Sequence, residues 1–172
     1  KWRTLDITSQ QLNAYAQGRY RFSTLAATIQ NTLHRRLPNL VPYKSVTSRA
    51  DTMQFAISFQ DTTLLRRVAL QKVSIPSLAT IEGKLYGHDS LNVKANIPTI
   101  YIGKEHLRNT NISVKGTPKE FLTNINTDRK HKRGFVNYSL RTDAHDDRLA
   151  IILALDNMRK PHTKGHIEVI AN

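Results

Sequence analysis

The stretch LNVKANI, residues 91–97, sets the fold that we predict for this chain. Its apolar side chains occupy every second position from Leu91 to Ile97, which is the period of a β-strand with one buried face. A turn signal, Gly87-His88-Asp89, comes just before it. The same alternation returns along most of the chain, so we expect a mainly β protein built from amphipathic strands.

Alternating segments lie on both sides of this stretch. Before it, residues 2–22 predict two short strands joined by a bend near Gly18, and residues 52–60 predict another strand. From Val73 onward the chain reads as strands and turns, a pattern typical of an antiparallel meander. The predicted breaks fall at residues 87–89, 116–118, 128–134, 143–147 and 159–165.

The apolar period changes to four residues between positions 23 and 37, which predicts an amphipathic helix. Its apolar stripe consists of Leu25, Ile29, Leu33 and Leu37. Ser23 or Thr24 is the expected N-cap, and Pro38 is expected to end the helix. We expect the stripe to pack against the sheet, and a helix lying on a membrane surface is the alternative. Residues 61–68 predict a second, short helix.

Composition limits the classes of function. The chain has 172 residues, enough for one domain with a core, and its 39% of hydrophobic residues suits strands with one wet face. It contains no cysteine, which excludes disulfides, zinc–thiolate sites and thiol catalysis. The longest apolar run, Leu149 to Leu155, is far shorter than the roughly 18 residues of a membrane-spanning helix. A net charge of +13 predicts attraction to polyanions such as nucleic acid, anionic lipid or lipopolysaccharide.

Candidate sites for chemistry are few. Asp143, His145, Asp146 and Asp147 form the densest set of possible metal ligands, which we interpret as a polar turn. His166 and Glu168 alternate with apolar neighbours and are interpreted as an outward polar face. No nucleophile elbow, phosphate loop or dinucleotide fingerprint is present, so we expect a non-catalytic protein without metal or cofactor.

One basic run stands out, and it is formed by Arg129, Lys130, Lys132 and Arg133 with His131 between them. It is either a nucleic-acid patch or a solvated hairpin loop between two strands. Aromatic residues for base stacking make up only 7% of the chain, which favours the loop. A basic nucleic-acid-binding domain stays open as an alternative function.

A faint internal repeat relates residues 73–78, VSIPSL, to residues 95–100, ANIPTI. Because proline cannot donate to a β-ladder, Pro76 and Pro98 should each mark a strand boundary, a sheet edge or a kink. The repeat favours an elongated sheet.

The repeat and its surroundings resemble the TamB/AsmA-like family. The resemblance is carried by GKLYGHDSLNVKA at residues 83–95, IPTIYIG at 97–103, NTNISVKG at 109–116 and GRYRF at 18–22, which leads into the helix. It covers most of the chain, although the strong positive charge departs from what we expect of such a module. A missing initial methionine and this resemblance together suggest an internal or C-terminal-half periplasmic piece of a longer protein, anchored in the inner membrane of a Gram-negative bacterium.

The resemblance implies a curled antiparallel sheet, shaped as a half-pipe or taco, with a hydrophobic groove. Within the chain, we expect a strand pair and the helix in residues 1–45 and a β-meander in residues 52–172. The implied role is outer-membrane biogenesis, either by moving phospholipid between membranes or by assisting outer-membrane protein assembly. The implied partners are phospholipid acyl chains and an outer-membrane β-barrel protein. A scaffold that only binds another envelope protein, by β-strand addition at an open sheet edge, is an alternative function.

Alternation places every second side chain on one face, so a curled sheet of this kind would be lined by apolar residues. The predicted lining residues are Met53, Phe55, Ile57, Phe59, Leu91, Val93, Ala95, Ile97, Ile112, Val114, Leu149, Ile151, Leu153 and Leu155. A closed core made from the same residues is the alternative that the sequence leaves open.

Overall fold

A computed structural model describes residues 1–45, 51–60, 72–87, 89–131, 134–157 and 163–171. These residues form one antiparallel sheet of eleven strands and one helix, which confirms the predicted mainly β class. The elements are β1 (Arg3–Thr8), β2 (Leu12–Arg19), α1 (Phe22–His34), β3 (Thr52–Phe59), β4 (Val73–Ser74), β5 (Ala79–Tyr86), β6 (Ser90–Ile102), β7 (Glu105–Gly116), β8 (Phe121–His131), β9 (Gly134–His145), β10 (Arg148–Asn157) and β11 (Thr163–Ala171).

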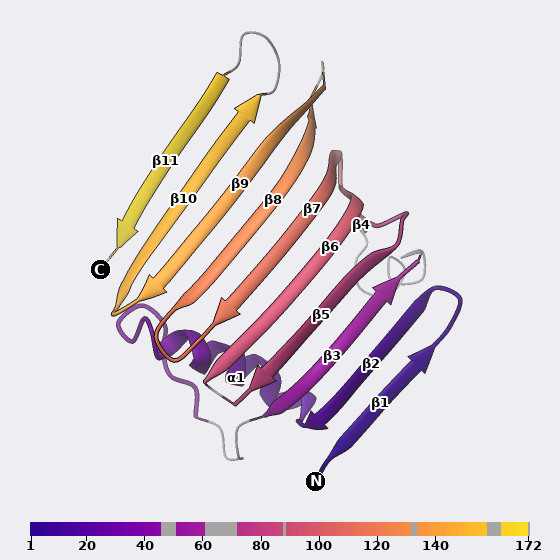
Figure 1. The fold of residues 1–172 in the computed structure, drawn as a ribbon, viewed down its shortest axis with the longest axis vertical. Coiled ribbons are helices and arrows are strands. Elements are labelled where there is room, and N and C mark those ends of the chain that lie inside the picture. Colours follow the sequence, from indigo (N-terminus) through magenta and orange to yellow (C-terminus); the bar gives the residue numbers. More distant parts are fainter. Residues whose placement is uncertain (46–50, 61–71, 88, 132–133, 158–162, 172) are drawn as a thin grey trace.

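The strands follow one another in the sheet almost in chain order. The order is β1-β2-β3-β5-β6-β7-β8-β9-β10-β11, with the short β4 paired to the end of β6. Figure 1 shows β1 and β11 at opposite edges, so the sheet is not closed on itself. Short turns join β1 to β2 and the successive strands from β5 to β8 and from β9 to β10, because a hairpin is the simplest connection between antiparallel strands, whereas α1 lies between β2 and β3.

Four predicted breaks differ from the structure. Those at 143–147 and 159–165 are too wide, because β9 continues to His145 and β11 begins at Thr163. The first two strands are joined at residues 9–11, and Gly18 lies inside β2 with a φ of 145° beside the backbone of Thr52. The predicted break at 128–134 is too wide, because β8 continues to His131 and β9 begins at Gly134. All four errors have one cause, since polar residues and glycine inside strands resemble a turn. The short helix predicted at 61–68 lies outside the described residues.

The two prolines of the repeat have different roles. Pro76 lies between β4 and β5, as expected for a strand boundary. Pro98 lies inside β6, where Ile97 and Ile100, three positions apart, both pack against the cluster of Ile75 and Ala79. The alternation of side chains between the two faces of the sheet is therefore interrupted at Pro98. The neighbouring strand β7 has a register shift against β8 at the same level, where Asn109 has a φ of 51°.

The pairing register sorts the alternating residues into rows that cross the strands. We define the helix row as Arg3, Gly18, Met53, Leu85, Leu91, Gly116, Phe121, Ala144, Leu149 and Ala171. The middle row is Leu5, Ala16, Phe55, Gly83, Val93, Val114, Thr123, Thr142, Ile151 and Val169. The aliphatic row is Ile7, Ala14, Ile57, Ile81, Ala95, Ile112, Ile125, Leu140, Leu153 and Ile167. Because paired residues share a face, the three rows form one face that is apolar except at Arg3, Thr123 and Thr142, and the intervening residues form a mainly polar face.

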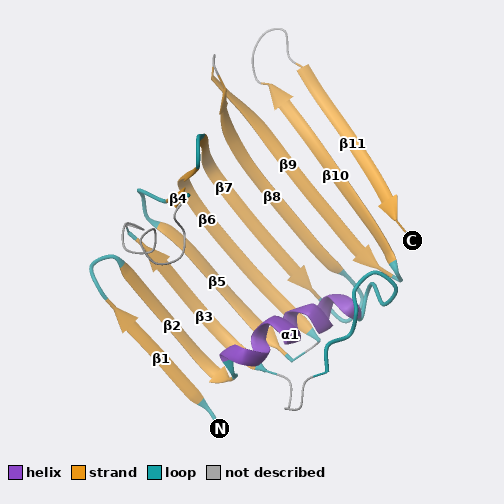
Figure 2. Cartoon of the chain, turned by 180° about the vertical axis from the view of Figure 1, so that it is seen from behind, coloured by secondary structure: helices purple, strands orange, loops and turns teal. Residues whose placement is uncertain are grey.

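The helix lies across one end of the apolar face, as Figure 2 shows. The γ-methyl carbon of Thr32 would lie 3.3 Å from a Cβ placed on Gly116, which is in the helix row. Leu85, Leu91 and Ala144 of this row are almost completely buried, whereas the aliphatic row is half-buried or exposed. Helix α1 therefore lies over the helix row at β6 and β7, and no element that the structure describes covers the next two rows.

The expected packing of the helix is wrong. Its buried residues are Ala27, Thr28, Asn31 and Thr32, while Ile29 of the predicted stripe is 42% exposed and Leu25 and Leu33 are half-buried. Leu37 is buried, but it follows the helix, which ends at His34. The N-cap is Arg21, without a side-chain capping bond, in place of the predicted Ser23 or Thr24.

None of the described residues forms a helix that is long and apolar enough to cross a membrane.

Candidate functional site: an open apolar sheet face

The aliphatic row is the most regular feature of the molecule. It takes one residue from each of ten neighbouring strands, and all ten are alanine, isoleucine or leucine. With about 4.8 Å between strands, the row is about 43 Å long. No charged or hydroxyl side chain interrupts it. It can therefore offer the same apolar contact along its whole length.

The structure places all fourteen predicted lining residues on this one face. Their exposure differs, because Leu91 lies beneath the helix and Ile97 is buried against Ile75 and Ala79 at the other end. The remaining twelve are half-buried. The rows also include residues absent from the predicted set, among them Ile7, Ile81 and Ile125. These residues belong to the same period-2 pattern in the sequence, and the pairing register places them in the same row as the predicted lining residues.

Two glycines of the apolar face lie opposite phenylalanines. Gly83 pairs with Phe55, whose ring carbons would lie 2.6 and 2.7 Å from a Cβ at Gly83. Gly116 pairs with Phe121, whose ring carbons would lie 3.1 and 3.3 Å from such a Cβ. Each ring therefore lies over the bare backbone of the next strand. This cross-strand arrangement supplies the apolar cover that glycine lacks.

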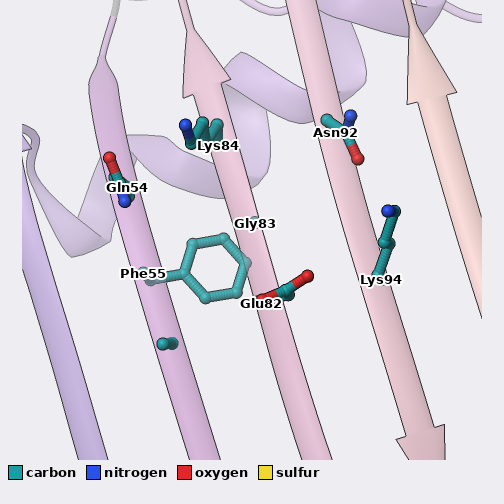
Figure 3. Close-up of a pocket in the computed structure, with 8 residues that line it drawn as sticks. Gln54, Phe55, Glu82, Gly83, Lys84, Asn92 and Lys94 are labelled. Atoms are coloured by element: carbon teal, nitrogen blue, oxygen red, sulfur yellow. The ribbon is translucent and has the colours of Figure 1, made fainter.

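The opposite face of the sheet is polar over β3 to β8. A hollow of about 440 Å³ lies over β3, β5 and β6, and its lining includes Gln54, Glu82, Lys84, Asn92 and Lys94 (Figure 3). It mixes one carboxylate with amides and ammonium groups. A second hollow, of about 350 Å³, includes four asparagines in its lining, and the Asn96 side chain donates to that of Asn111 at 2.8 Å. Neither hollow contains a pair of carboxylates, and no hydrogen bond joins a hydroxyl to a basic side chain among the described residues that line them.

Helix α1 is held at its N-terminus by one buried carboxylate. Asp51, which is 3% exposed and precedes β3, accepts hydrogen bonds from the backbone N–H of Arg21 (3.1 Å) and the hydroxyls of Thr24 (2.6 Å) and Thr28 (3.2 Å). A negative charge at a helix N-terminus is also favoured by the helix dipole. A polar contact from a residue distant in sequence therefore fixes this end of the helix.

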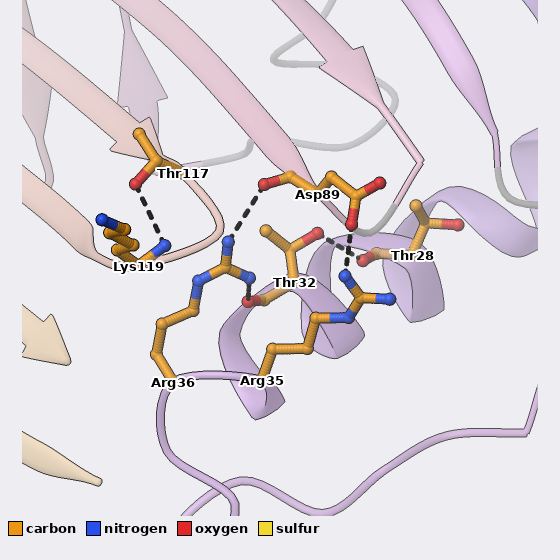
Figure 4. A network of polar contacts seen from close by, with 7 residues as sticks. All are labelled: Thr28, Thr32, Arg35, Arg36, Asp89, Thr117 and Lys119. Carbon is orange, nitrogen blue, oxygen red and sulfur yellow. Dashed lines mark hydrogen bonds and ion pairs between the residues drawn. The ribbon is translucent and has the colours of Figure 1, made fainter. Parts of the chain in front are cut away.

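The other end is held by two arginines (Figure 4). The buried Arg36 guanidinium donates to the carbonyl oxygens of Thr32 and, at 3.0 Å, Asp89. The neighbouring Arg35, half of whose side chain is exposed, forms an ion pair with the Asp89 carboxylate. Burial lowers the pKa of Arg36, and the positive charge of Arg35 adds to this effect. The two contacts with Asp89 join the end of the helix to the turn between β5 and β6.

The candidate metal cluster is a turn. Asp146 and Asp147 have φ values of 47° and 60° between β9 and β10, a backbone typical of a two-residue type I′ hairpin turn. His145 contacts Asp143 at 3.1 Å, and the Asp147 carboxylate accepts from the side chain and the backbone N–H of Asn39. Among the described residues, no group of three or more possible ligands is placed to hold a metal ion.

The described part of the basic run does not form one patch. Arg129 pairs with Leu107 and its guanidinium binds both oxygens of Glu105, at 2.6 and 2.7 Å. This bond raises the pKa of Arg129 and lowers that of Glu105. Lys130, the next residue in the strand, points to the polar face. Lys132 and Arg133 lie outside the described residues.

Aromatic and charged side chains meet on the polar face at the far end of β6 to β9. The rings of Tyr101 and His106 stack at 4.5 Å, and the Arg108 guanidinium lies 3.5 Å from the centre of the Phe135 ring. Burial alone would raise the pKa of Asp128. Hydrogen bonds from Asn137 and Asn109, together with the charge of Arg108, outweigh it and lower that pKa. The cluster satisfies its own charges and holds the bulged strand in place.

Comparisons with models of known protein families, with curated proteins and with solved structures found no match for this chain. The resemblance to the TamB/AsmA-like family therefore stays a prediction, and function has to be argued from the apolar face itself.

Proposed function

We propose that this chain is a non-catalytic segment of a Gram-negative cell-envelope protein whose apolar sheet face holds phospholipid acyl chains during transport between membranes. The observation that carries the proposal is the unbroken aliphatic row, which crosses ten strands and lies beside an equally long middle row. The half-pipe curvature and the periplasmic location implied by the family resemblance belong to the same proposal.

Physical chemistry supports lipid as the ligand. Each CH₂ group removed from water gains about 0.8 kcal/mol, so an acyl chain needs only a continuous apolar surface and no directional contact. A row without polar interruptions has no deep site to trap the chain, which suits movement along it. The net charge of +13 supports anionic phospholipid in particular, since it attracts negatively charged headgroups.

A crosslinking experiment tests this function. A photoreactive amino acid is placed at Val93, in the middle row, or at the exposed Lys94, its neighbour on the polar face. We expect several-fold more phospholipid adduct from position 93 in living bacteria and after incubation with lipid vesicles. Equal labelling from the two positions would overturn the proposal.

Strand addition at the sheet edge is the second candidate function. The outer edge of β11 is unpaired in the described structure, and Ile167, Val169 and Ile170 of this strand are more than half exposed. A long apolar edge strand is a template for pairing with another chain. An outer-membrane barrel protein crosslinked from β11, with no lipid adduct at position 93, would favour this function over transport.

A further inference from the structure

The apolar stripe of helix α1 is only partly covered by the residues that the structure describes, since Ile29 is 42% exposed and Leu25 and Leu33 are half-buried. Two threonines mark the side of the helix that faces the sheet. Thr28 donates a hydrogen bond to Asp51, which precedes β3, and Thr32 lies against Gly116 of β7. With 100° between successive helical residues, Leu25, Ile29 and Leu33 lie on a flank about 90° from that direction. Phe22 lies on the same flank and is 66% exposed.

The opposite flank of the helix is covered by the chain that follows it. Gln30 donates to the carbonyl oxygen of Pro42 at 2.8 Å, a ring nitrogen of His34 lies 2.6 Å from that of Val41, and Asn31 exchanges two 2.8 Å bonds with Lys44. Figure 2 shows this segment on the side of the helix that faces the strand ends. The apolar stripe must therefore face the other way, along the sheet toward the middle and aliphatic rows.

The helix runs in the same direction as the rows. Its N-terminus is fixed by Asp51 beside β3, and its last turn lies against Gly116 at the end of β7. Thirteen helical residues span about 20 Å, which is long enough to cross the three strand spacings from β3 to β7 at about 4.8 Å each. The stripe therefore forms a side wall of the open apolar surface, and the middle and aliphatic rows form the base of that surface.

The residues around the N-terminal end of the helix indicate the kind of lipid. Arg3, Arg19 and Arg21 are exposed and close together in the backbone, because Arg3 pairs with Gly18, next to Arg19. Trp2 is 65% exposed beside them, and the first helical turn carries no acidic residue. Exposed apolar and aromatic side chains flanked by arginines are typical of surfaces that bind anionic lipid.

We infer that α1 is the lipid-contacting side wall of the apolar face, and that it holds an anionic phospholipid whose acyl chains lie between the stripe and the middle row. The inference rests on the proposed function and adds the position and headgroup class of the ligand. The polar anchors at Asp51, Arg35 and Arg36 explain how the helix can lie on the sheet without burying its apolar stripe completely.

The experiment places the photoreactive amino acid at Ile29 on the stripe or at the exposed Ser23 on the opposite flank, with the Val93 variant measured in parallel. Each purified protein is incubated with vesicles of phosphatidylethanolamine alone or with an equal part of phosphatidylglycerol. We expect several-fold more lipid adduct from Ile29 than from Ser23, and only with phosphatidylglycerol present. In addition, Ile29→Glu should reduce labelling from Val93 several-fold, while Ser23→Glu should leave it unchanged.

The outcomes separate the two proposals. Labelling from Val93 without labelling from Ile29 would overturn the side wall and leave the transport function standing. Absence of lipid at both positions would overturn both. Equal labelling with both vesicle types would overturn the anionic headgroup, and crosslinks from Ile29 to a second copy of the chain would assign the stripe to self-association.

Discussion

Glycine and phenylalanine act as cross-strand pairs in this sheet. At Gly83 the backbone adopts an ordinary strand conformation, so the residue is not needed for an unusual φ. It is needed because the Phe55 ring and the carbonyl oxygen of Asn92 occupy the space that a Cβ would enter. The period-2 pattern of the sequence marks Gly83 as a gap in the apolar face, whereas the structure shows that a ring fills the gap.

Gly83→Ala should therefore destabilise the protein. A new methyl group must displace the Phe55 ring and press on the β6 backbone, and overpacking of this kind costs about 1–3 kcal/mol. Gly165→Ala is the matched control, because its Cβ would meet only the Leu155 side chain at 3.7 and 3.8 Å. Urea unfolding measures both variants. A Gly83→Ala protein as stable as Gly165→Ala would show that the ring moves freely.

Helix α1 shows how an element can be predicted correctly and oriented wrongly. A four-residue apolar period predicts the helix, and hydrophobicity favours burying the stripe. The helix instead buries Thr28, Asn31 and Thr32, because Asp51, Lys44 and the turn at Asp89 satisfy its polar groups. Buried polar atoms need hydrogen-bond partners, so the positions of these partners decide which face turns inward.

The two arginines at the helix end should differ in their effect on stability. Arg36→Ala removes a buried guanidinium and leaves the carbonyl oxygens of Thr32 and Asp89 without its hydrogen bonds, and we expect a loss of about 2–4 kcal/mol. Arg35→Ala breaks an exposed ion pair with the same Asp89 and should cost less than about 1 kcal/mol. Thermal unfolding and hydrogen exchange of residues 22–34 measure the difference. Equal losses of stability in the two variants would mean that contact with Asp89, and not burial of the guanidinium, decides how strongly each arginine holds the helix end.

At the scale of the whole molecule, charge and apolar surface act on the same ligand in different ways. The net charge of +13 attracts an anionic vesicle from a distance and is screened by salt, whereas the apolar rows act only on contact and are insensitive to salt. Binding should therefore have a salt-sensitive part and a salt-resistant part.

Ile112→Asp should remove the salt-resistant part. It places a charge in the middle of the aliphatic row, where Ile112 pairs with Ala95 and Ile125. Ser113→Asp adds the same charge on the polar face of the same strand and is the control. Co-sedimentation with phosphatidylglycerol vesicles, at low salt and at about 1 M salt where screening acts within about 3 Å, measures both parts. Equal retention of the two variants at high salt would contradict a role for the row.

The strands, the two faces and the absence of cysteine chemistry follow from the amino-acid sequence, because alternation is local and each strand carries its own period-2 signal. Its main local errors, at Gly18 and at residues 128–134, came from glycine and polar residues inside strands. The alignment of the strands with one another depends on long-range pairing, which the sequence pattern does not contain. Register depends on turn lengths and on the bulge at Asn109, and it is register that joins ten short alternations into one aliphatic row. The tertiary structure also decided the direction of the helix stripe, because the carboxylate of Asp51 and the carbonyl oxygen of Asp89 that hold the helix lie 23 or more positions from the groups they bind.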